Sequence, residues 1–133
     1  MFDHEKLQVY QRALRFVDFA HELLAKTQKN MAVHSQLDRA STSILLNIAE
    51  GNGKYTARDR CRFFDIARGS TLECAAILDV TVRRKAIEKA QSIKGKEILR
   101  EIVAMLVGLI RSQNADRVYE NACAYSSREQ EKE

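Results

Sequence analysis

Apolar residues recur along this chain at steps of three and four, the spacing of an amphipathic α-helix. The pattern predicts helices over residues 3–28, 33–50, 57–88 and 96–114. Short polar or glycine-containing segments separate them. Four amphipathic helices with short connections predict an all-α, up-down-up-down four-helix bundle.

The first predicted helix carries two apolar stripes about 110° apart around its axis. One stripe consists of Leu7, Tyr10, Leu14, Val17 and Leu24, and the other consists of Val9, Ala13, Phe16, Ala20 and Leu23. A helix in a single small bundle needs only one such face. The second stripe therefore favours packing against a partner outside the bundle, which points to an oligomer.

Glycine marks the connection between the second and third predicted helices. Gly51 is expected to stop the second helix in the left-handed conformation, and Gly53 to allow a second unusual backbone angle. Thr56 is expected to cap the third helix, with Asp59 three residues later. A longer polar connection over residues 89–96 contains Gly95 and precedes the fourth helix.

At 133 residues the chain is long enough for one domain with a buried core. We expect residues 1–114 to form the bundle, and residues 115–133 to form a polar extension of the fourth helix or a flexible tail. Cys61, Cys74 and Cys123 have no metal-ligand spacing. Because the sequence has no signal peptide and no long apolar run, we expect reduced cysteines, a cytoplasmic location and no membrane span.

The sequence offers little chemistry for catalysis. His4, His21 and His34 form no His/Glu pair at metal-ligand spacing, and a di-metal site in a bundle would need Glu-x-x-His on two helices. The glycine-rich run at residues 51–54 follows a predicted helix rather than a strand, and it lacks the spacing of a phosphate loop. We therefore expect no enzyme activity, no metal and no cofactor.

Basic residues give the clearest functional indication. The formal net charge is +4, a mild excess that is compatible with an anionic partner. The candidate nucleic-acid-binding residues lie along the third helix in two groups: Lys54, Arg58, Arg60, Arg62 and Arg68 near its start, and Arg83, Arg84 and Lys85 near its end. Such groups hold phosphates as point charges or forks. A solvated helix face without a ligand is the alternative.

Several short motifs carry a family resemblance. They are Gln36-Leu37-x-Arg39-Ala40, Ser43-Ile44, Asn47-Ile48-Ala49-Glu50-Gly51-x-Gly53, Arg62-Phe63, Ile66-Ala67-x-Gly69-Ser70-x-x-Glu73, Val9-Tyr10-Gln11-x-Ala13 and Gly108-Leu109-Ile110-Arg111-Ser112. In these motifs the chain resembles the small bacterial four-helix-bundle family known from proteins encoded in 23S ribosomal RNA intervening sequences. The resemblance covers most of the chain, up to Ser112.

This resemblance implies a four-helix bundle that assembles as a ring-like homopentamer. A similar fold is found in the accessory variability protein (Avd) of diversity-generating retroelements, which is basic and pentameric and binds a reverse transcriptase and nucleic acid. The likeness implies RNA or DNA, structured RNA first, and a reverse transcriptase as partners. The motif residues Arg39, Asn47, Glu50, Gly51 and Gly53 are expected to be structural, with ligand binding as the alternative. Asn47 and Glu50 are expected to close hydrogen bonds around the turn.

The sequence is compatible with three functions. The first is a non-catalytic oligomeric adaptor that binds nucleic acid and docks a reverse transcriptase. The alternative is a protein–protein scaffold of the intervening-sequence type that binds no nucleic acid. The third, a small-molecule-binding bundle, needs a polar-lined internal cavity, whereas the pattern predicts a packed apolar core.

Overall fold

The structure is a computed structural model that describes residues 1–27 and 32–132, with side chains described as far as Asn114. These residues form a 3₁₀ helix and four α-helices, and contain no strand: η1 (Asp3–Lys6), α1 (Gln8–Ala25), α2 (Ala32–Asn52), α3 (Ala57–Arg83) and α4 (Lys89–Lys132). The prediction of an all-α chain with four helices is confirmed. Most of the predicted connection after the first helix lies outside the described residues.

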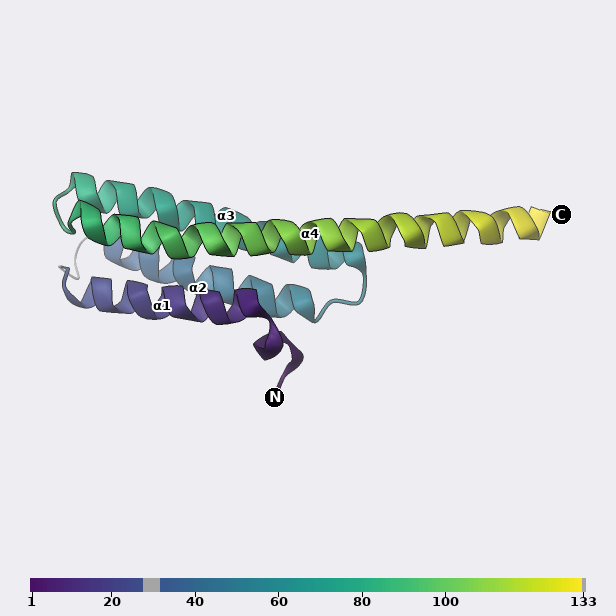
Figure 1. The fold of residues 1–133 in the computed structure, drawn as a ribbon, viewed down its shortest axis with the longest axis horizontal. Coiled ribbons are helices and arrows are strands. Elements are labelled where there is room, and N and C mark those ends of the chain that lie inside the picture. The colour runs from purple at the N-terminus through teal and green to yellow at the C-terminus, as the bar shows by residue number, and fades with distance from the viewer. Residues whose placement is uncertain (28–31, 133) are drawn as a thin grey trace.

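The four α-helices lie side by side, and consecutive helices run in opposite directions (Figure 1). Helix α1 contacts α2 and α4, and α3 contacts the same two helices, so each helix has two neighbours. A helix with neighbours on two sides needs apolar residues toward both of them. Leu24 of the first α1 stripe is buried, and Leu7 and Tyr10 pack against the same core. The second stripe and three members of the first are thus explained within the bundle. Leu14 and Val17 of the first stripe are only half-buried, and the oligomer stays a prediction.

The apolar residues of α2 at steps of three and four are all buried: Leu37, Ala40, Ile44 and Ile48. Two residues of α3 depart from the usual division into an apolar core and a polar surface. Ile66 is 43% exposed, whereas Thr71 is fully buried. Thr71 is tolerated there because its hydroxyl donates to the Ala67 carbonyl oxygen at 2.8 Å.

The glycines between α2 and α3 matter for their size rather than for an unusual backbone angle. None of the five glycines has a positive φ, so the predicted left-handed stop at Gly51 and the special angle at Gly53 are wrong. Helix α2 continues through Gly51 to Asn52. A Cβ atom at Gly51 would lie 2.9 Å from the Cβ of Phe63, so only glycine allows this close approach of α2 and α3.

The predicted cap of α3 is confirmed. The Thr56 hydroxyl accepts a hydrogen bond from the Asp59 backbone N–H at 3.1 Å, which satisfies one of the free amides at the helix start. Helix α3 then runs for 27 residues without a break, and Gly69 within it is exposed. A Cβ atom at Gly69 would meet nothing within 4 Å, so no close backbone approach explains this glycine.

The predicted boundaries of the α3–α4 connection are wrong by several residues. Helix α3 ends at Arg83, and α4 begins at Lys89 rather than at residue 96. Gly95 is buried inside α4, where a Cβ atom would lie 2.6 Å from Cε1 of Phe19. The prediction failed because three of the first residues of α4 are polar and exposed, which hides the apolar face of this segment: Lys89, Lys94 and Glu97.

Lys85 takes the place of glycine in the turn after α3. Its φ is 59°, the left-handed region that lysine rarely adopts. The Ala86 N–H donates to the Thr81 carbonyl oxygen at 3.0 Å, and the Lys85 N–H donates to that of Val82 at 2.9 Å. This pair of bonds is a Schellman motif, in which glycine is the usual left-handed residue.

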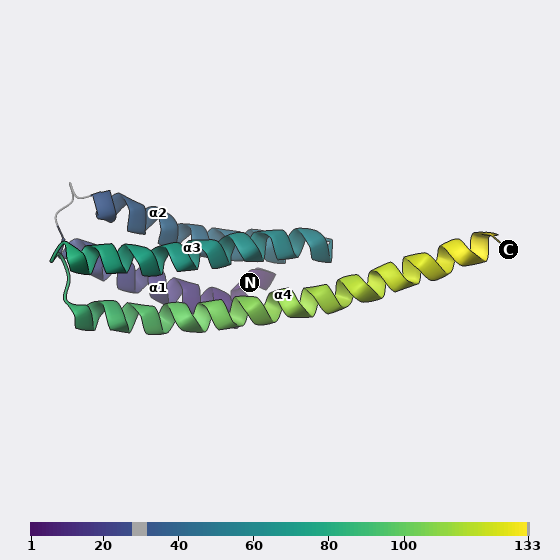
Figure 2. The ribbon, with the colours of Figure 1, turned by 90° about the horizontal axis from the view of Figure 1, so that it is seen from above.

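Helix α4 extends well beyond the other three helices (Figure 2). The division into a bundle over residues 1–114 and an extension over residues 115–133 stays a prediction. Within the described part of the chain, no helix is both long enough and apolar enough to span a membrane.

Candidate nucleic-acid interface

The predicted nucleic-acid-binding residues lie in two groups along α3, with Arg68 of the first group near the middle of the helix. We call the first group the α2–α3 cluster, which consists of Lys54, Arg58, Arg60, Arg62 and Arg68, and the second the α3–α4 cluster, which consists of Arg83, Arg84 and Lys85. Because α3 has 27 residues, its ends lie about 40 Å apart. The structure therefore separates the two clusters rather than bringing them together.

Arg60 of the α2–α3 cluster is engaged by the protein itself. Its side chain is half-buried and donates to the carbonyl oxygens of Lys54 at 2.9 Å and Tyr55 at 2.8 Å. It also donates to Oε1 of Gln113 on α4 at 2.6 Å. The guanidinium holds the α2–α3 turn against α4, and we therefore remove Arg60 from the candidate interface.

Two further members of the α2–α3 cluster are partly neutralised. Arg68 pairs with Asp65 on the same helix at 3.0 Å. Lys54 lies 3.9 Å from the carboxylate of Glu50, and its ammonium sits 5.0 Å from the ring centroid of Phe63. These surface pairs contribute little to stability, but they reduce the charge that is available to a ligand.

Arg58 and Arg62 are exposed and form no ion pair among the described side chains. The Arg62 guanidinium lies 5.8 Å from the ring centroid of Phe63, a cation–π contact that leaves its donors free. Arg83 of the α3–α4 cluster is also exposed. At 100° per residue, Arg58, Arg62 and Arg83 lie within about 60° of one another around α3, so they share its outward face.

Three of the acidic residues near this face are paired with a cation outside the trio, whereas Asp59, next to Arg58, forms no ion pair among the described side chains. The pairs are Asp65 with Arg68, Glu73 with Arg39, and Asp79 with Lys96. Arg39 reaches Glu73 at 2.5 Å, and this bond joins α2 to α3. The three arginines therefore face solvent without an ion pair, and Asp59 is the acidic residue that offsets part of the charge of Arg58 and Arg62.

Asn47 of the family motif bonds within α2 rather than around the turn. Its side-chain amide donates to the Ser43 carbonyl oxygen at 2.8 Å and to the Ser43 hydroxyl at 3.1 Å. The Ser43 and Ser70 hydroxyls lie 2.8 Å apart, so the chain of bonds crosses to α3. Glu50 makes only the long ion pair with Lys54. The expectation that these two residues close the turn is wrong, because Arg60 does so.

Cys74 is buried at the centre of α3. Burial raises its pKa to about 12, the nearby Glu73 carboxylate adds to the rise, and the Arg39 charge opposes it. A thiol with this pKa is protonated at neutral pH and is a poor nucleophile. Among the side chains that the structure describes, no three His, Cys, Asp or Glu residues gather as metal ligands.

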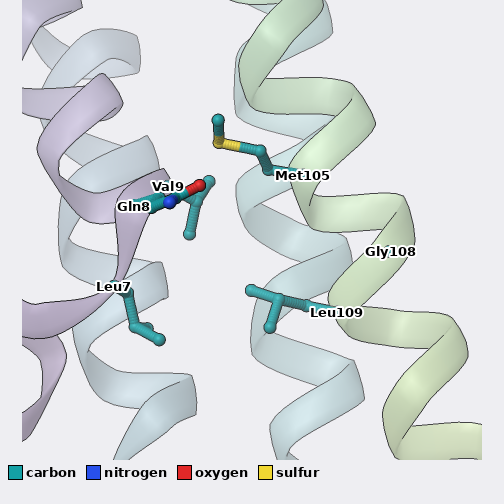
Figure 3. Close-up of a pocket in the computed structure, with 6 residues that line it drawn as sticks. All are labelled: Leu7, Gln8, Val9, Met105, Gly108 and Leu109. Atoms are coloured by element: carbon teal, nitrogen blue, oxygen red, sulfur yellow. The ribbon is translucent and has the colours of Figure 1, made fainter.

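An apolar hollow lies between the start of α1 and the middle of α4. Figure 3 shows the side chains of Leu7 and Val9 on one side of it and those of Met105 and Leu109 on the other. Its volume is about 290 Å³, and no charged residue lines it. It is a surface groove, not the polar-lined internal cavity that a small-molecule-binding bundle would need.

Residues 5–108 match the family described as 23S rRNA-intervening sequence protein. The chain belongs to this family. Its fold is also similar to a crystal structure of a protein of unknown function from the S23 ribosomal protein family of Bacteroides thetaiotaomicron. The TM-score is 0.71 at 25% sequence identity, over 77% of this chain and 97% of that chain. A search of curated proteins gave no match. The family part of the resemblance is thus confirmed, and the likeness to Avd stays a prediction.

Proposed function

We propose that this member of the 23S rRNA-intervening sequence family is a non-catalytic, homo-oligomeric adaptor that binds structured RNA along the outward face of α3. The observation that carries the proposal is the set of exposed arginines without acidic partners on this face, Arg58, Arg62 and Arg83. The family description names where its members are encoded rather than what they bind, so the choice of structured RNA over DNA rests on the resemblance alone. A reverse transcriptase as a second partner rests on the likeness to Avd alone.

The spacing of these arginines favours an extended ligand. Arg58 and Arg83 are 25 positions apart, which is about 38 Å along the helix. No single nucleotide bridges that distance, whereas successive phosphates of one polynucleotide do. Contacts of this kind position a nucleic acid without reading its sequence. We therefore expect the protein to recognise the shape and charge of the RNA.

The oligomer is supported by apolar side chains that the single bundle leaves exposed. Away from the basic face of α3 these include Phe2, Leu46 and Tyr55, of which Leu46 is 58% exposed. Burying them against other copies would remove apolar surface from water. We propose the homopentamer that the family resemblance implies, which would repeat the basic face and strengthen its field. Sedimentation tests this, and a monomer at micromolar concentration contradicts it.

RNA binding is tested by fluorescence anisotropy with a labelled RNA hairpin at several salt concentrations. We expect the binding constant to fall steeply with salt, because phosphate neutralisation releases counterions. The double variant Arg58→Glu/Arg62→Glu should weaken binding by about 10-fold or more and flatten the salt dependence by about one unit per lost phosphate contact. The control is Arg15→Glu, an exposed arginine on α1, which does not contact α3. No binding at low salt, or equal loss in the control, rejects the proposal.

A protein–protein scaffold is the second candidate, and a groove between α3 and α4 favours it. The groove has a volume of about 410 Å³ and a largely apolar lining that includes Leu72, Ala75, Leu99 and Val103. A pull-down distinguishes the candidates, because a protein partner that survives nuclease and high salt would support the scaffold. Loss of all partners after nuclease treatment would support the RNA adaptor.

A further inference from the structure

A pocket at the α3–α4 turn combines unpaired positive charge with a buried hydroxyl. Its volume is about 560 Å³, and its lining comes from the end of α3 and the start of α4: Asp79, Val82, Arg83, Lys89, Ser92, Ile93 and Lys96. These two helix ends lie side by side at one end of the bundle (Figure 1). The pocket is therefore far from the α2–α3 cluster.

The charge of the lining is positive and only partly compensated. Three cations and one carboxylate give a formal charge of +2 at neutral pH. Lys96 pairs with Asp79, which leaves Arg83 and Lys89 without an acidic partner among the described side chains. Lys89 is also the first residue of α4, whose first turn contains no acidic residue, and the positive end of the helix dipole lies there.

Ser92 differs from every other buried polar residue in the described core. The side chains of Ser41, Thr71 and Thr81 donate to backbone carbonyl oxygens of the preceding turn, and Ser70 shares a bond with Ser43. The Ser92 hydroxyl has no hydrogen-bond partner among the described residues, although the residue is only 4% exposed.

The position of Ser92 explains how this hydroxyl is tolerated. No described polar side-chain atom is completely enclosed without a partner, so the Ser92 hydroxyl keeps an opening, and the pocket that it lines supplies that opening. Ser92 lies one turn before Gly95 on the core-facing side of α4, where an apolar residue would pack without the cost of an unbonded hydroxyl. A hydroxyl at this position is accounted for if a ligand accepts its hydrogen bond.

We propose that this pocket binds a phosphate monoester, with Arg83 and Lys89 as charged contacts and the Ser92 hydroxyl as a donor to a phosphate oxygen. A monoester carries nearly two negative charges at neutral pH, which matches the +2 lining better than the single charge of a phosphodiester does. Val82 and Ile93 add apolar wall for the carbon part of an ester, which free phosphate lacks. Two sources share this chemistry: the 5′-phosphorylated end of an RNA and a free nucleoside monophosphate. The first source rests on the proposed function, and the second does not.

The test compares two RNA oligonucleotides of one sequence, labelled at the 3′ end, with either a 5′-phosphate or a 5′-hydroxyl. We expect the 5′-phosphorylated RNA to bind about 10-fold more tightly, a preference that charge-assisted contacts readily supply. Adenosine 5′-monophosphate against adenosine, measured by calorimetry, forms the second arm. A preference only in the RNA arm identifies the RNA end as the source, and a preference in both arms identifies the monoester itself.

Variants separate a ligand role from a structural one. Ser92→Ala and Lys89→Ala should each reduce the 5′-phosphate preference several-fold, while Ser92→Ala leaves the melting temperature equal or higher because it removes an unbonded hydroxyl. Arg58→Ala, at the other end of α3, is the control: it should weaken both RNAs and leave their ratio unchanged.

The outcomes distinguish this proposal from the RNA adaptor. Equal binding of both RNAs and of both adenosine ligands overturns the pocket while RNA binding stands. Absence of RNA binding with a retained preference for adenosine 5′-monophosphate rejects the adaptor and supports the pocket. An unchanged preference in both Ser92→Ala and Lys89→Ala also overturns the pocket.

Discussion

The two ends of α3 are built differently. At its start, Gly51 allows α2 to touch Phe63, Thr56 caps the helix, and Arg60 makes three hydrogen bonds that hold the turn to α4. At its end, Lys85 adopts a left-handed backbone, and Ser92 leaves a buried hydroxyl unbonded among the described residues. The unusual residues at the start improve contacts, whereas Lys85 at the end adopts a backbone conformation that costs free energy.

This difference indicates where a ligand belongs. A left-handed lysine costs about 1–2 kcal/mol. The Ser92 hydroxyl has no partner among the described residues, although it keeps an opening into the pocket. Positions that lower the stability of the free protein without a structural return are typical of functional sites. By this reasoning the α2–α3 end is mainly structural, with two free arginines on its surface, and the α3–α4 end is the better candidate for a specific contact.

Cys74 tests whether the centre of α3, between its two different ends, excludes water. The unfolded thiol has a pKa of 9.0 and the folded one of about 12, so only the unfolded state loses its proton between these values. The stability contribution is present below pH 9 and is lost as pH rises, by about 1.4 kcal/mol per pH unit. Denaturant unfolding of the native protein and of Cys74→Ala from pH 8 to 10.5 should diverge accordingly. Parallel curves would mean that water reaches Cys74.

The structural role of the α2–α3 end is tested by Arg60→Ala. We expect a loss of about 2–3 kcal/mol in the free energy of unfolding, because hydrogen bonds to charged groups contribute about 1.5–3 kcal/mol and two turn carbonyls lose their donor. Arg58→Ala is the matched control, since Arg58 is exposed on the same helix and should change stability by less than about 0.5 kcal/mol. Equal losses of unfolding free energy in the two variants would contradict the structural role of Arg60.

The close contact at the same end is tested by Gly51→Ala. The added methyl group would lie 2.9 Å from Phe63, and overpacking of this kind costs about 1–3 kcal/mol. The higher helix propensity of alanine returns about 1 kcal/mol, so a net loss of up to about 2 kcal/mol is expected. Gly69→Ala, where nothing lies within 4 Å, should instead stabilise the protein by about 0.5–1 kcal/mol. Thermal melts measure both, and a gain in both variants would contradict the packing role of Gly51.

The strain at the α3–α4 end is tested by Lys85→Gly. Glycine removes the left-handed penalty but adds chain entropy to the unfolded state, so we expect a net gain of about 0.5–1 kcal/mol. Arg84→Gly also removes one positive charge, but its φ of −81° is ordinary, and it should cost about 0.5–1 kcal/mol. Opposite signs in chemical denaturation support strain at Lys85, and a loss in both variants argues against it.

Most of the fold could be predicted from the sequence, because the core stripes of α1 and α2 repeat at clear helical spacing. The start of α4 could not. Its first two turns expose Lys89 and Lys94, and Gly95 resembles a loop glycine until its contact with Phe19 is known. A signal was present, since Ser92, Gly95 and Leu99 continue the buried face of α4 backward in steps of three and four.

The site was less predictable, because charge alone does not show which cations are already bound. Arg60 and Arg58 look alike in the sequence, yet the partner that engages Arg60 on α4 is Gln113, 53 residues away. Asp79 and Lys96 also pair across a gap in the sequence, of 17 positions. Ser92 was missed because its burial depends on the helix that the prediction placed too late.

The length of α4 makes the two ends of the bundle different in shape. Beyond Asn114 the helix continues for 18 residues to Lys132, about 27 Å, and it leaves the bundle at the end where α2 joins α3 (Figure 2). A bulky body that approaches the bundle along its axis from that side meets the projecting helix first. The projecting helix does not extend on the opposite side, where the pocket between Arg83 and Ser92 lies, so it does not obstruct a ligand that approaches the pocket from there.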